Sequence, residues 1–209
     1  MSRLLEGTAW RKVNSARFHR LFYPQVPVVI TVEFEGRIGG MPAIWHTPLS
    51  FVPPMFGVAI APEHETYRLI KGARAFGVNW LDFSYADGVG ELGEIGGRGY
   101  VNKLSSVDFR TIRGEACHQP LIVGASAILE CRYSDTYRIG THRFIVGRVI
   151  AARANRNFSD YWDNTQYHPL LYSGTKNGKR KSWVFRSLNG EAVAVPLRHQ
   201  RIRTKIRSG

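Results

Sequence analysis

Short apolar segments rich in β-branched residues recur along most of this chain and are separated by turn residues. β-Branched side chains favour strands because they pack well on a pleated sheet. The segments predicted as strands are 27–34, 55–61, 75–81, 126–133, 142–152, 182–186 and 191–197. Gly140 separates two of them and Asn189-Gly190 separates the last two, and both spacings predict antiparallel hairpins. Many strands and few helices predict a mainly β fold, a closed or partly closed β-barrel with a few short helices.

The predicted helices are short. Asn14 can cap an amphipathic helix over SARFHRLF, and residues 102–109 are a further candidate. Thr66 begins a segment that runs to Ala73 and carries apolar residues at helical spacing. A helix N-terminus offers backbone N–H groups that suit a phosphate. The alternative for Thr66 is simple capping of the helix.

Glycine-rich segments are predicted as turns and loops. Residues 35–37 and 39–40 are expected to turn the chain after the first strand, and residues 82–99 contain six glycines and are expected to form a long loop. The run GVGELG (88–93) has the letters of a G-x-G-x-x-G dinucleotide site. Such a site also needs a strand before it and a helix after it, and neither is predicted here. We therefore interpret this run as part of the loop.

Length and hydropathy predict one globular domain. The chain has 209 residues with 44% hydrophobic residues, enough to bury a core. No apolar run approaches the roughly 20 residues that a membrane-spanning helix needs. The N-terminal residues lack the apolar run of a signal peptide. We therefore expect a cytoplasmic protein that does not associate with membranes.

The net charge of +13 is concentrated near the C-terminus. Residues 1–175 hold 19 Lys and Arg against 15 Asp and Glu, whereas residues 176–209 hold 10 against one. A basic tail can bind nucleic acid through phosphates. It can also be a solvated surface or a strand paired with a partner subunit. We favour these last two readings because the only aromatic residues of the tail, Trp183 and Phe185, lie in one strand-like segment.

The two cysteines do not indicate a metal or redox site. Cys117 and Cys131 are far apart in the sequence and form no C-x-x-C motif. We expect two small buried thiols and predict no metal ligands.

Polar side chains gather in the predicted turns of the segment Met41–Asn79. Trp45, His46, Thr47 and Ser50 lie in a predicted loop between two apolar strands, before a Pro-Pro break. Apolar residues fill the strands, so the polar groups are displayed by the turns. This pattern indicates a scaffold that presents polar groups to a flat, anionic ligand.

The same segment resembles the flavin reductase-like family of FMN-binding split barrels, which includes flavoredoxins and ferric reductases. The family pattern consists of N-x-M-x-A-x-W-x-x-P-x-S-x-x-P-P, a strand, an Arg/His-x-Thr helix start and F-x-V-N. The matching residues are Met41, Ala43, Trp45, Pro48, Ser50, Pro53, Pro54, His64, Thr66, Phe76, Val78 and Asn79. Gly39 stands where the family has its leading Asn.

Three later segments, 97–103, 140–149 and 168–174, follow in the order of the family pattern. The resemblance extends over residues 18–186. It implies a single flavin reductase-like domain over residues 1–209, with the FMN-binding split-barrel fold and a basic tail over 187–209.

The resemblance also implies a site. The residues that it assigns to FMN are Ala43, Ile44, Trp45, His46, Thr47, Ser50, His64, Thr66, Asn79, Lys103 and Tyr172. Ser50, Thr66 and His64 are expected at the phosphate, and the isoalloxazine ring is expected against residues 43–47. A flavin ring needs a flat apolar contact and backbone donors near N5 and O4.

His142 is the candidate catalytic residue, because the histidine of the family's G-D-H segment lies where nicotinamide approaches the flavin. Thr141 replaces the acid of that segment. An edge-strand histidine with a structural role is the alternative.

The resemblance predicts a homodimer with FMN at the subunit interface. The expected reaction is hydride transfer from NADH or NADPH to the flavin, which then reduces free flavin, a ferric complex or a partner protein. One alternative is an FMN-carrying electron-transfer protein that oxidises NAD(P)H poorly. The other is a β-barrel that binds nucleic acid through its basic tail.

Overall fold

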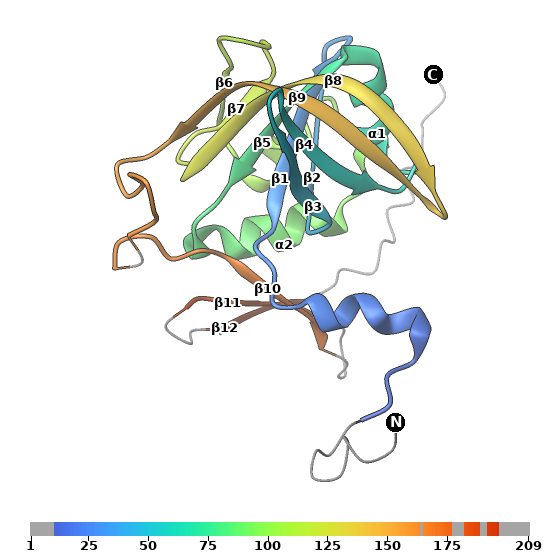
Figure 1. Cartoon of the computed structure of the whole chain (residues 1–209), viewed down its shortest axis with the longest axis vertical. Helices are drawn as coiled ribbons and strands as arrows, with labels where there is room; N and C mark the ends of the chain where they lie inside the picture. Colours follow the sequence, from blue (N-terminus) through green and yellow to red (C-terminus); the bar gives the residue numbers. More distant parts are fainter. Residues whose placement is uncertain (1–10, 164, 177–181, 189–191, 197–209) are drawn as a thin grey trace, which may run out of the picture.

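The computed structural model describes residues 11–163, 165–176, 182–188 and 192–196. Its main element is a seven-stranded antiparallel sheet that curls into a barrel (Figure 1). The strands, in their order across the sheet, are β2 (Arg37–Ala43), β1 (Val28–Phe34), β5 (Ala75–Trp80), β8 (Ala127–Ile139), β9 (His142–Ala154), β4 (Pro54–Ile60) and β3 (His46–Phe51). The mainly β fold predicted from the sequence is confirmed.

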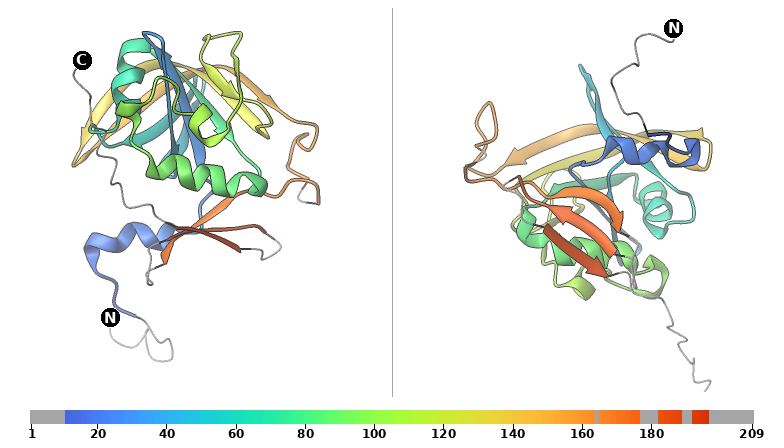
Figure 2. Two further views of the ribbon diagram at one scale, coloured as in Figure 1. Left: turned by 180° about the vertical axis from the view of Figure 1, so that it is seen from behind. Right: turned by 90° about the horizontal axis from the view of Figure 1, so that it is seen from below.

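Two small sheets and a few helices surround this barrel. The small sheets contain β6 (Thr111–Arg113) with β7 (Pro120–Ile122), and β10 (Leu171–Lys176), β11 (Ser182–Arg186) and β12 (Ala192–Pro196). The α-helices are α1 (Glu65–Ala73) and α2 (Ala86–Glu94), and the 3-10 helices are η2 (Ser15–Phe22), η3 (Phe83–Tyr85), η4 (Gly97–Gly99) and η5 (Ser105–Val107). Figure 2 shows that α2 lies between the barrel and the sheet of β10, β11 and β12. Within the described residues, no helix is both long and apolar enough to cross a bilayer.

The molecule has one core inside the barrel and a second core outside it. The barrel core consists of Val28, Ile30, Val32, Ala43, Phe56, Val58, Ile60, Leu69, Ile70, Phe76, Val78, Cys131, Tyr133 and Ile145. The outer core consists of Val29, Leu81, Ala86, Val89, Leu92, Leu104, Val107, Phe109, Ile122, Leu170, Tyr172, Phe185 and Val195. Because residues 28–32 of β1 are buried on both faces, this part of the strand is apolar apart from Thr31 and lacks the polar alternation of a half-exposed strand.

Both predicted hairpins are confirmed. β8 and β9 pair antiparallel up to the register pair Ile139 and His142. β11 and β12 pair up to Arg186 and Ala192, whereas the predicted turn residues Asn189-Gly190 lie outside the described residues. β12 belongs to the basic tail and pairs with β11 of its own chain. Residues 197–209 of the tail also lie outside the described residues.

The prediction of a long loop over residues 82–99 is wrong, because α2 contains the whole GVGELG run. A Cβ at Gly90 would lie 2.8 Å from Cβ of Val195, and a Cβ at Gly88 would lie 2.6 Å from the Phe109 ring. The glycines let α2 approach its neighbours closely instead of breaking the helix. From the sequence, the same glycines are a loop signal.

Three further local predictions need correction. Residues 39–40 lie inside β2 and not in a turn, and residues 46–51 form the edge strand β3 and not a loop. Of the candidate helix over 102–109, only η5 is helical. A Cβ at Gly40 would lie 2.7 Å from a methyl group of Leu104, so close packing explains this glycine as well.

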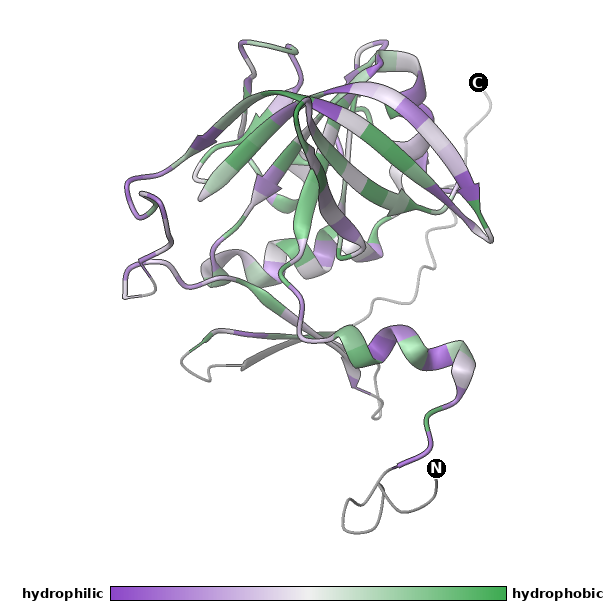
Figure 3. Ribbon diagram, viewed as in Figure 1, coloured by the Kyte–Doolittle hydropathy of each residue, from purple (hydrophilic) through white to green (hydrophobic). Residues whose placement is uncertain are grey.

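Hydrophobic residues also occur along η2 and the long strands, as the colouring of Figure 3 shows, and some of them are exposed. On η2, Phe18, Leu21 and Phe22 are exposed, and at the turn between β3 and β4 Phe51 and Val52 are 94% and 91% exposed. Large exposed apolar groups of this kind mark candidate contact surfaces.

Candidate functional site

Three adjoining cavities lie between the barrel, α2, η2 and the sheet of β10, β11 and β12. The polar cavity, of about 540 Å³, is lined by Met41, Pro42, Glu63, His64, Glu65, Thr66, Gly93, Glu94, Ile95, Gly96, Gly97, Arg98, Lys103 and Trp183. The aromatic cavity, of about 210 Å³, is lined by His19, Tyr23, Pro27, Pro42, Ile44, Trp45, Val89, Gly93, Tyr172, Trp183 and Phe185. The apolar groove, of about 290 Å³, is lined by Phe18, His19, Phe22, Gln25, Trp45, His46, Thr47, Ala59 and Phe144.

Shared wall residues join the three cavities. The polar and aromatic cavities share Pro42, Gly93 and Trp183, and the aromatic cavity shares His19 and Trp45 with the apolar groove. Small-molecule sites usually measure about 300–1,000 Å³, so the polar cavity alone is large enough for a ligand.

The polar cavity combines a helix N-terminus with a buried cation. α1 begins after His64, which is its N-cap residue and makes no capping bond with its side chain. Thr66 is the buried second residue of this helix, so it does not cap α1 as the sequence suggested. The Lys103 side chain is buried, and its Nζ donates to the carbonyl oxygen of Gly40 at 2.8 Å. Burial lowers the pKa of Lys103 to about 8.

An ion-pair network holds the Lys103 segment against α1. The Glu65 carboxylate accepts from Arg37 and from Arg68, each at 2.8 Å, and the hydrogen bond from Arg68 holds its pKa below the usual range. Arg37 also donates to the carbonyl oxygens of Gly97 and Arg98 at 3.3 and 3.0 Å. These bonds hold the segment that contains Lys103 close to the start of α1. Thr66 and Lys103, which are far apart in the sequence, therefore line the same cavity.

Tyr172 is the centre of the aromatic cavity. Its ring centroid lies 4.9 Å from that of Tyr23, 5.2 Å from that of Trp183 and 5.8 Å from that of Phe185. The Tyr172 hydroxyl lies 3.2 Å from Oγ1 of Thr175, and burial raises its pKa. Such rings offer flat apolar contact to a planar ligand.

His142, the predicted catalytic residue, lies beside Trp45. The two ring centroids are 4.7 Å apart, and Nδ1 of His142 lies 2.9 Å from Oγ1 of Thr141. Burial lowers the pKa of His64, and the nearby charges of Lys103 and His142 lower it further while Glu63 opposes them.

Most of the predicted flavin residues line the three cavities. His64, Thr66 and Lys103 line the polar cavity, and Ile44 and Tyr172 line the aromatic cavity. Trp45 lies between the aromatic cavity and the apolar groove, which His46 and Thr47 also line.

Four predicted residues do not line any of these cavities, and one of them is His142, the catalytic candidate beside Trp45. Asn79 is buried, and its amide donates to Val29 and Thr31 and accepts from the N–H of Ile122 at 2.8 Å, so it holds strands together. The Ala43 side chain is buried in the barrel core. Ser50 is exposed on β3 and pairs with Met55 at the start of β4, whereas α1 follows the other end of β4.

Sequence reasoning missed Trp183, which lines both the polar and the aromatic cavity. Its Nε1 donates to the Glu94 carboxylate at the end of α2. The sequence signal at this position is an aromatic residue within the basic segment 176–209. No local pattern connects this position with residues 89–94, because the contact is made only when β11 packs on α2.

The residues present fit a flavin nucleotide. A phosphate is recognised by an ammonium group, hydroxyls and a helix N-terminus, which Lys103, Thr66 and α1 supply. A planar ring is recognised by aromatic walls, which the adjoining cavity supplies. No group of three or more metal-ligating side chains occurs in the part of the chain that the structure describes.

Comparisons with known proteins agree with this geometry. The chain matches the model of the flavin reductase like domain over residues 18–177. It is 37% identical over 165 residues to an uncharacterized protein from Aeropyrum pernix. The aligned residues make up 78% of this chain and 63% of that protein. It is 28% identical over 142 residues to an NADH-dependent FAD reductase from Streptomyces globisporus. The aligned residues make up 66% of this chain and 76% of that protein. The chain therefore spans less than two thirds of the length of the Aeropyrum pernix relative.

Solved structures show the same fold. An FMN-binding protein from Thermus thermophilus is similar with a TM-score of 0.67 and 26% identity, over 92% of this chain and 98% of that one. A flavoredoxin from Methanosarcina acetivorans is similar with a TM-score of 0.69 and 23% identity, over 93% of this chain and 96% of that one. The family model covers well over half of the chain, the barrel is that of FMN-binding split-barrel proteins, and this chain belongs to the flavin reductase-like family.

Proposed function

We propose that this protein is an FMN-binding oxidoreductase that transfers hydride from NADH or NADPH to flavin. Electrons then pass to free flavin, a ferric complex or a partner protein. The observation that carries the proposal is the contact between a polar cavity with a buried lysine and an aromatic cavity, joined through Pro42, Gly93 and Trp183. The NADH-dependent FAD reductase of Streptomyces globisporus supports this class of reaction.

The chain's own residues would position the flavin, which supplies the redox chemistry when bound. Lys103, Thr66 and the N-terminus of α1 would hold the phosphate. Trp183 and Tyr172 would pack against the ring system and exclude water from it. His142, beside Trp45, would orient the carboxamide of the nicotinamide by hydrogen bonding.

The test compares FMN with riboflavin, which lacks the phosphate. The dissociation constants of both are measured by flavin fluorescence quenching on the purified protein. We expect FMN to bind more tightly, by roughly tenfold for one charge-assisted hydrogen bond of about 1.5 kcal/mol. Equal constants would show that the polar cavity does not bind the phosphate.

The role of His142 is tested by stopped-flow bleaching of bound flavin at saturating NADH or NADPH. We expect His142→Ala to slow flavin reduction and to leave the FMN dissociation constant little changed. If His142→Ala reduces flavin at the wild-type rate, the role of His142 is structural, at the start of β9. A large loss of FMN affinity would make it a flavin ligand instead.

An FMN-carrying electron-transfer protein is the second candidate. The similar Thermus thermophilus protein is an FMN-binding protein, and the similar Methanosarcina acetivorans protein is a flavoredoxin. If the purified protein binds FMN but neither NADH nor NADPH bleaches the bound flavin, the electron-transfer function is supported.

We also propose that the protein acts as a homodimer in the cytoplasm. The exposed apolar residues on η2 and at the turn between β3 and β4 support a contact between copies. Cys117 and Cys131 are free thiols, which fits a reducing compartment. Nucleic-acid binding by residues 198–209, which lie outside the described residues, is the least favoured alternative.

A further inference from the structure

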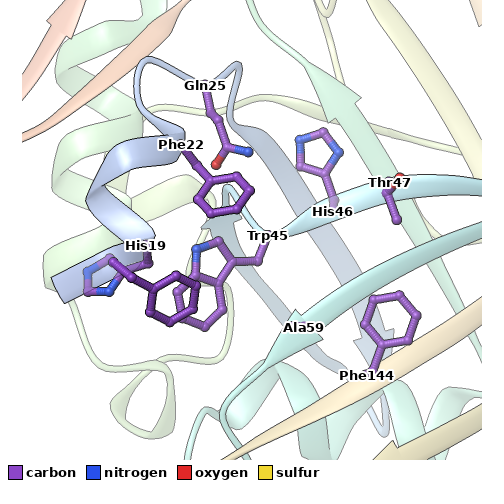
Figure 4. A pocket seen from close by; sticks show the side chains of 9 residues that line it. His19, Phe22, Gln25, Trp45, His46, Thr47, Ala59 and Phe144 are labelled. Carbon is purple, nitrogen blue, oxygen red and sulfur yellow. The ribbon is translucent and has the colours of Figure 1, made fainter. Parts of the chain in front are cut away.

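Another cavity lies at one end of the barrel, where β5 and β9 end and β8 begins. This cavity, which we call the Trp80 cavity, has a volume of about 290 Å³ and is lined by Trp80, Ala127, Ile128, Leu129, Ala152, Arg153, Ala154, Phe158 and Trp162. It shares no lining residue with the three cavities described above, including the apolar groove of Figure 4. The proposed flavin site therefore does not account for it.

The register of the strands gives the Trp80 cavity a floor of small side chains. Ala127 pairs with Trp80 on one side and with Ala154 on the other, and Leu129 pairs with Ala152. Residues directly opposite each other, and residues two apart along a strand, project from the same face of a sheet. Because alanine side chains are small, the space beside the Trp80 indole stays open to a ligand.

The loop after β9 supplies an aromatic wall that is already in place. Phe158 and Trp162 form a β-bridge, and their ring centroids are 5.1 Å apart. The Trp162 ring lies against that of the buried Tyr167, at a centroid distance of 4.1 Å. The N–H of Asp163 donates to the carbonyl oxygen of Asn157 at 2.9 Å. A wall that is ordered before binding lowers the entropic cost of binding a ligand.

Arg153, the one charged residue that lines the Trp80 cavity, is already neutralised. Its guanidinium donates to the Glu130 carboxylate at 3.2 Å and to the Glu115 carboxylate at 2.6 Å, and Glu130 is fully buried. One positive and two negative charges leave this group with a net charge of −1. An anion would therefore be repelled here, whereas a cation would be attracted.

The aromatic rings of the cavity can attract a cation as well. The face of an aromatic ring carries negative potential, and tryptophan binds cations best. Among the described residues, the only cation–π contact is that of Arg74 with Tyr133, at 3.9 Å from the ring centroid. The described Lys and Arg side chains therefore leave the rings of the Trp80 cavity open.

The side chains that line the cavity select the kind of cation. They are apolar or, as in Trp and Arg, hydrogen-bond donors, and none of them is an acceptor. A primary ammonium group would lose its hydration without replacing its hydrogen bonds. A quaternary ammonium group has no N–H to satisfy, and its methyl groups can pack on apolar walls.

We propose that the Trp80 cavity binds a free small molecule that carries a quaternary ammonium group. The cation lies against the rings of Trp80, Phe158 and Trp162, and its methyl groups pack on the alanine floor. The volume of the cavity is close to the lower end of the range for small-molecule sites, so the whole ligand is small. This binding function goes beyond the proposed flavin chemistry and does not rest on it.

The experiment titrates the full-length protein with three probes by ligand-observed NMR. Choline is a quaternary ammonium compound, neohexyl alcohol has the same shape with a carbon atom in place of the nitrogen, and ethanolamine is a primary ammonium compound. We expect choline to bind roughly fivefold to tenfold more tightly than either of the other two.

Variants of the aromatic wall test where the cation binds. Trp162→Leu and Phe158→Leu each keep an apolar wall but remove an aromatic face, so each should reduce the preference for choline over neohexyl alcohol. Tyr161→Leu is the matched control, because Tyr161 is an exposed ring of the same loop that does not line the cavity.

Equal binding of choline and neohexyl alcohol to the wild-type protein would overturn the proposal without any variant, and so would tighter binding of ethanolamine. If both wall variants keep the full preference for choline, or if Tyr161→Leu loses it equally, the cation binds outside the Trp80 cavity. A trimethyl-lysine peptide that binds more tightly than choline would reject a free small molecule and assign the cavity to a methylated protein.

Discussion

Lys103 is a lysine with 5% of its surface exposed, and the Gly40 carbonyl accepts from its Nζ at 2.8 Å. In the sequence, a single lysine after a glycine-rich segment has no property that separates it from a solvated surface charge. Burial changes its chemistry because a desolvated ammonium group gains when an anion comes close. The candidate role of Lys103 therefore depends on its surroundings and not on its residue type.

We predict that Lys103→Met lowers FMN affinity by roughly 10- to 150-fold, which corresponds to about 1.5–3 kcal/mol for a charge-assisted bond. Riboflavin affinity should be unchanged. Thermal stability should not fall, because an apolar side chain replaces a buried charge. Lys71→Met, which removes an exposed charge in the last turn of α1, is the control. If both variants weaken FMN equally, a general loss of positive potential explains the effect.

A second prediction concerns the pH dependence of FMN binding. The pKa of Lys103 is lowered from 10.5 to about 8 by burial. Above that pH the folded, ligand-free protein loses the ammonium charge, whereas the FMN phosphate stays dianionic because its second pKa is about 6. FMN affinity should therefore fall as the pH rises from 7.5 to 9.5, and riboflavin affinity should not. Quenching titrations at several pH values measure both, and a flat FMN profile would contradict a lysine–phosphate contact.

The pH dependence of folding stability has the opposite sign to that of FMN affinity. Between pH 8 and 10.5 the unfolded chain keeps the Lys103 proton that the folded, ligand-free protein has lost. This lysine therefore contributes an increase in stability as the pH rises through that window. Saturating FMN should reduce this contribution, since the phosphate favours the charged lysine.

At the scale of the elements, the sheet of β10, β11 and β12 closes the site from outside the barrel. β11 supplies Trp183 and Phe185, and β10 supplies Tyr172. The family match ends at residue 177, so β11 and β12 lie beyond it. Their contribution to the cavities follows from their packing on α2, where Gly90 lies against Val195.

We predict that Trp183→Ala weakens FMN and riboflavin equally, by roughly threefold to tenfold, because about 0.5–1.5 kcal/mol of ring contact is lost. Trp183→Phe should keep most of the affinity, since it retains a ring and loses only the bond to Glu94. Fluorescence quenching with both ligands separates this effect from that of Lys103→Met, which should act on FMN alone. A loss confined to FMN would place Trp183 at the phosphate and not at the ring.

At the scale of the whole molecule, the hairpin of β3 and β4 ends in apolar residues that its own chain does not cover. Phe51 and Val52 are almost fully exposed. Exposed apolar groups of this kind form a candidate contact surface. A second copy of the chain is the partner that the proposed homodimer supplies.

We predict that the wild-type protein is a dimer by light scattering and that Phe51→Asp combined with Val52→Asp shifts it toward monomer. Charges at the hairpin tip would have to be desolvated in the interface. Ile112→Asp changes an exposed apolar residue on β6 and is the control. A double variant that remains fully dimeric would exclude this hairpin from the interface.

The sequence by itself determined the elements that depend on local signals. The apolar runs predicted five of the seven strands of the barrel, all except β2 and β3. The Gly140 and Asn189-Gly190 spacings predicted two hairpins, because strand propensity and turn chemistry act over a few residues. The family pattern placed His64, Thr66, Lys103 and Tyr172, which the structure brings to two joined cavities.

Only the tertiary structure decided the rest, because it depends on contacts between distant residues. The glycines of α2 are loop signals until Val195 and Phe109 pack against them. Asn79 is a polar residue that the family pattern assigns to the ligand, but its amide holds β1 and β7 together in the core, because it donates to Val29 and accepts from the N–H of Ile122. Trp183 joins the site only when β11 packs on α2. Such roles are set by close packing and desolvation, which no short stretch of sequence encodes.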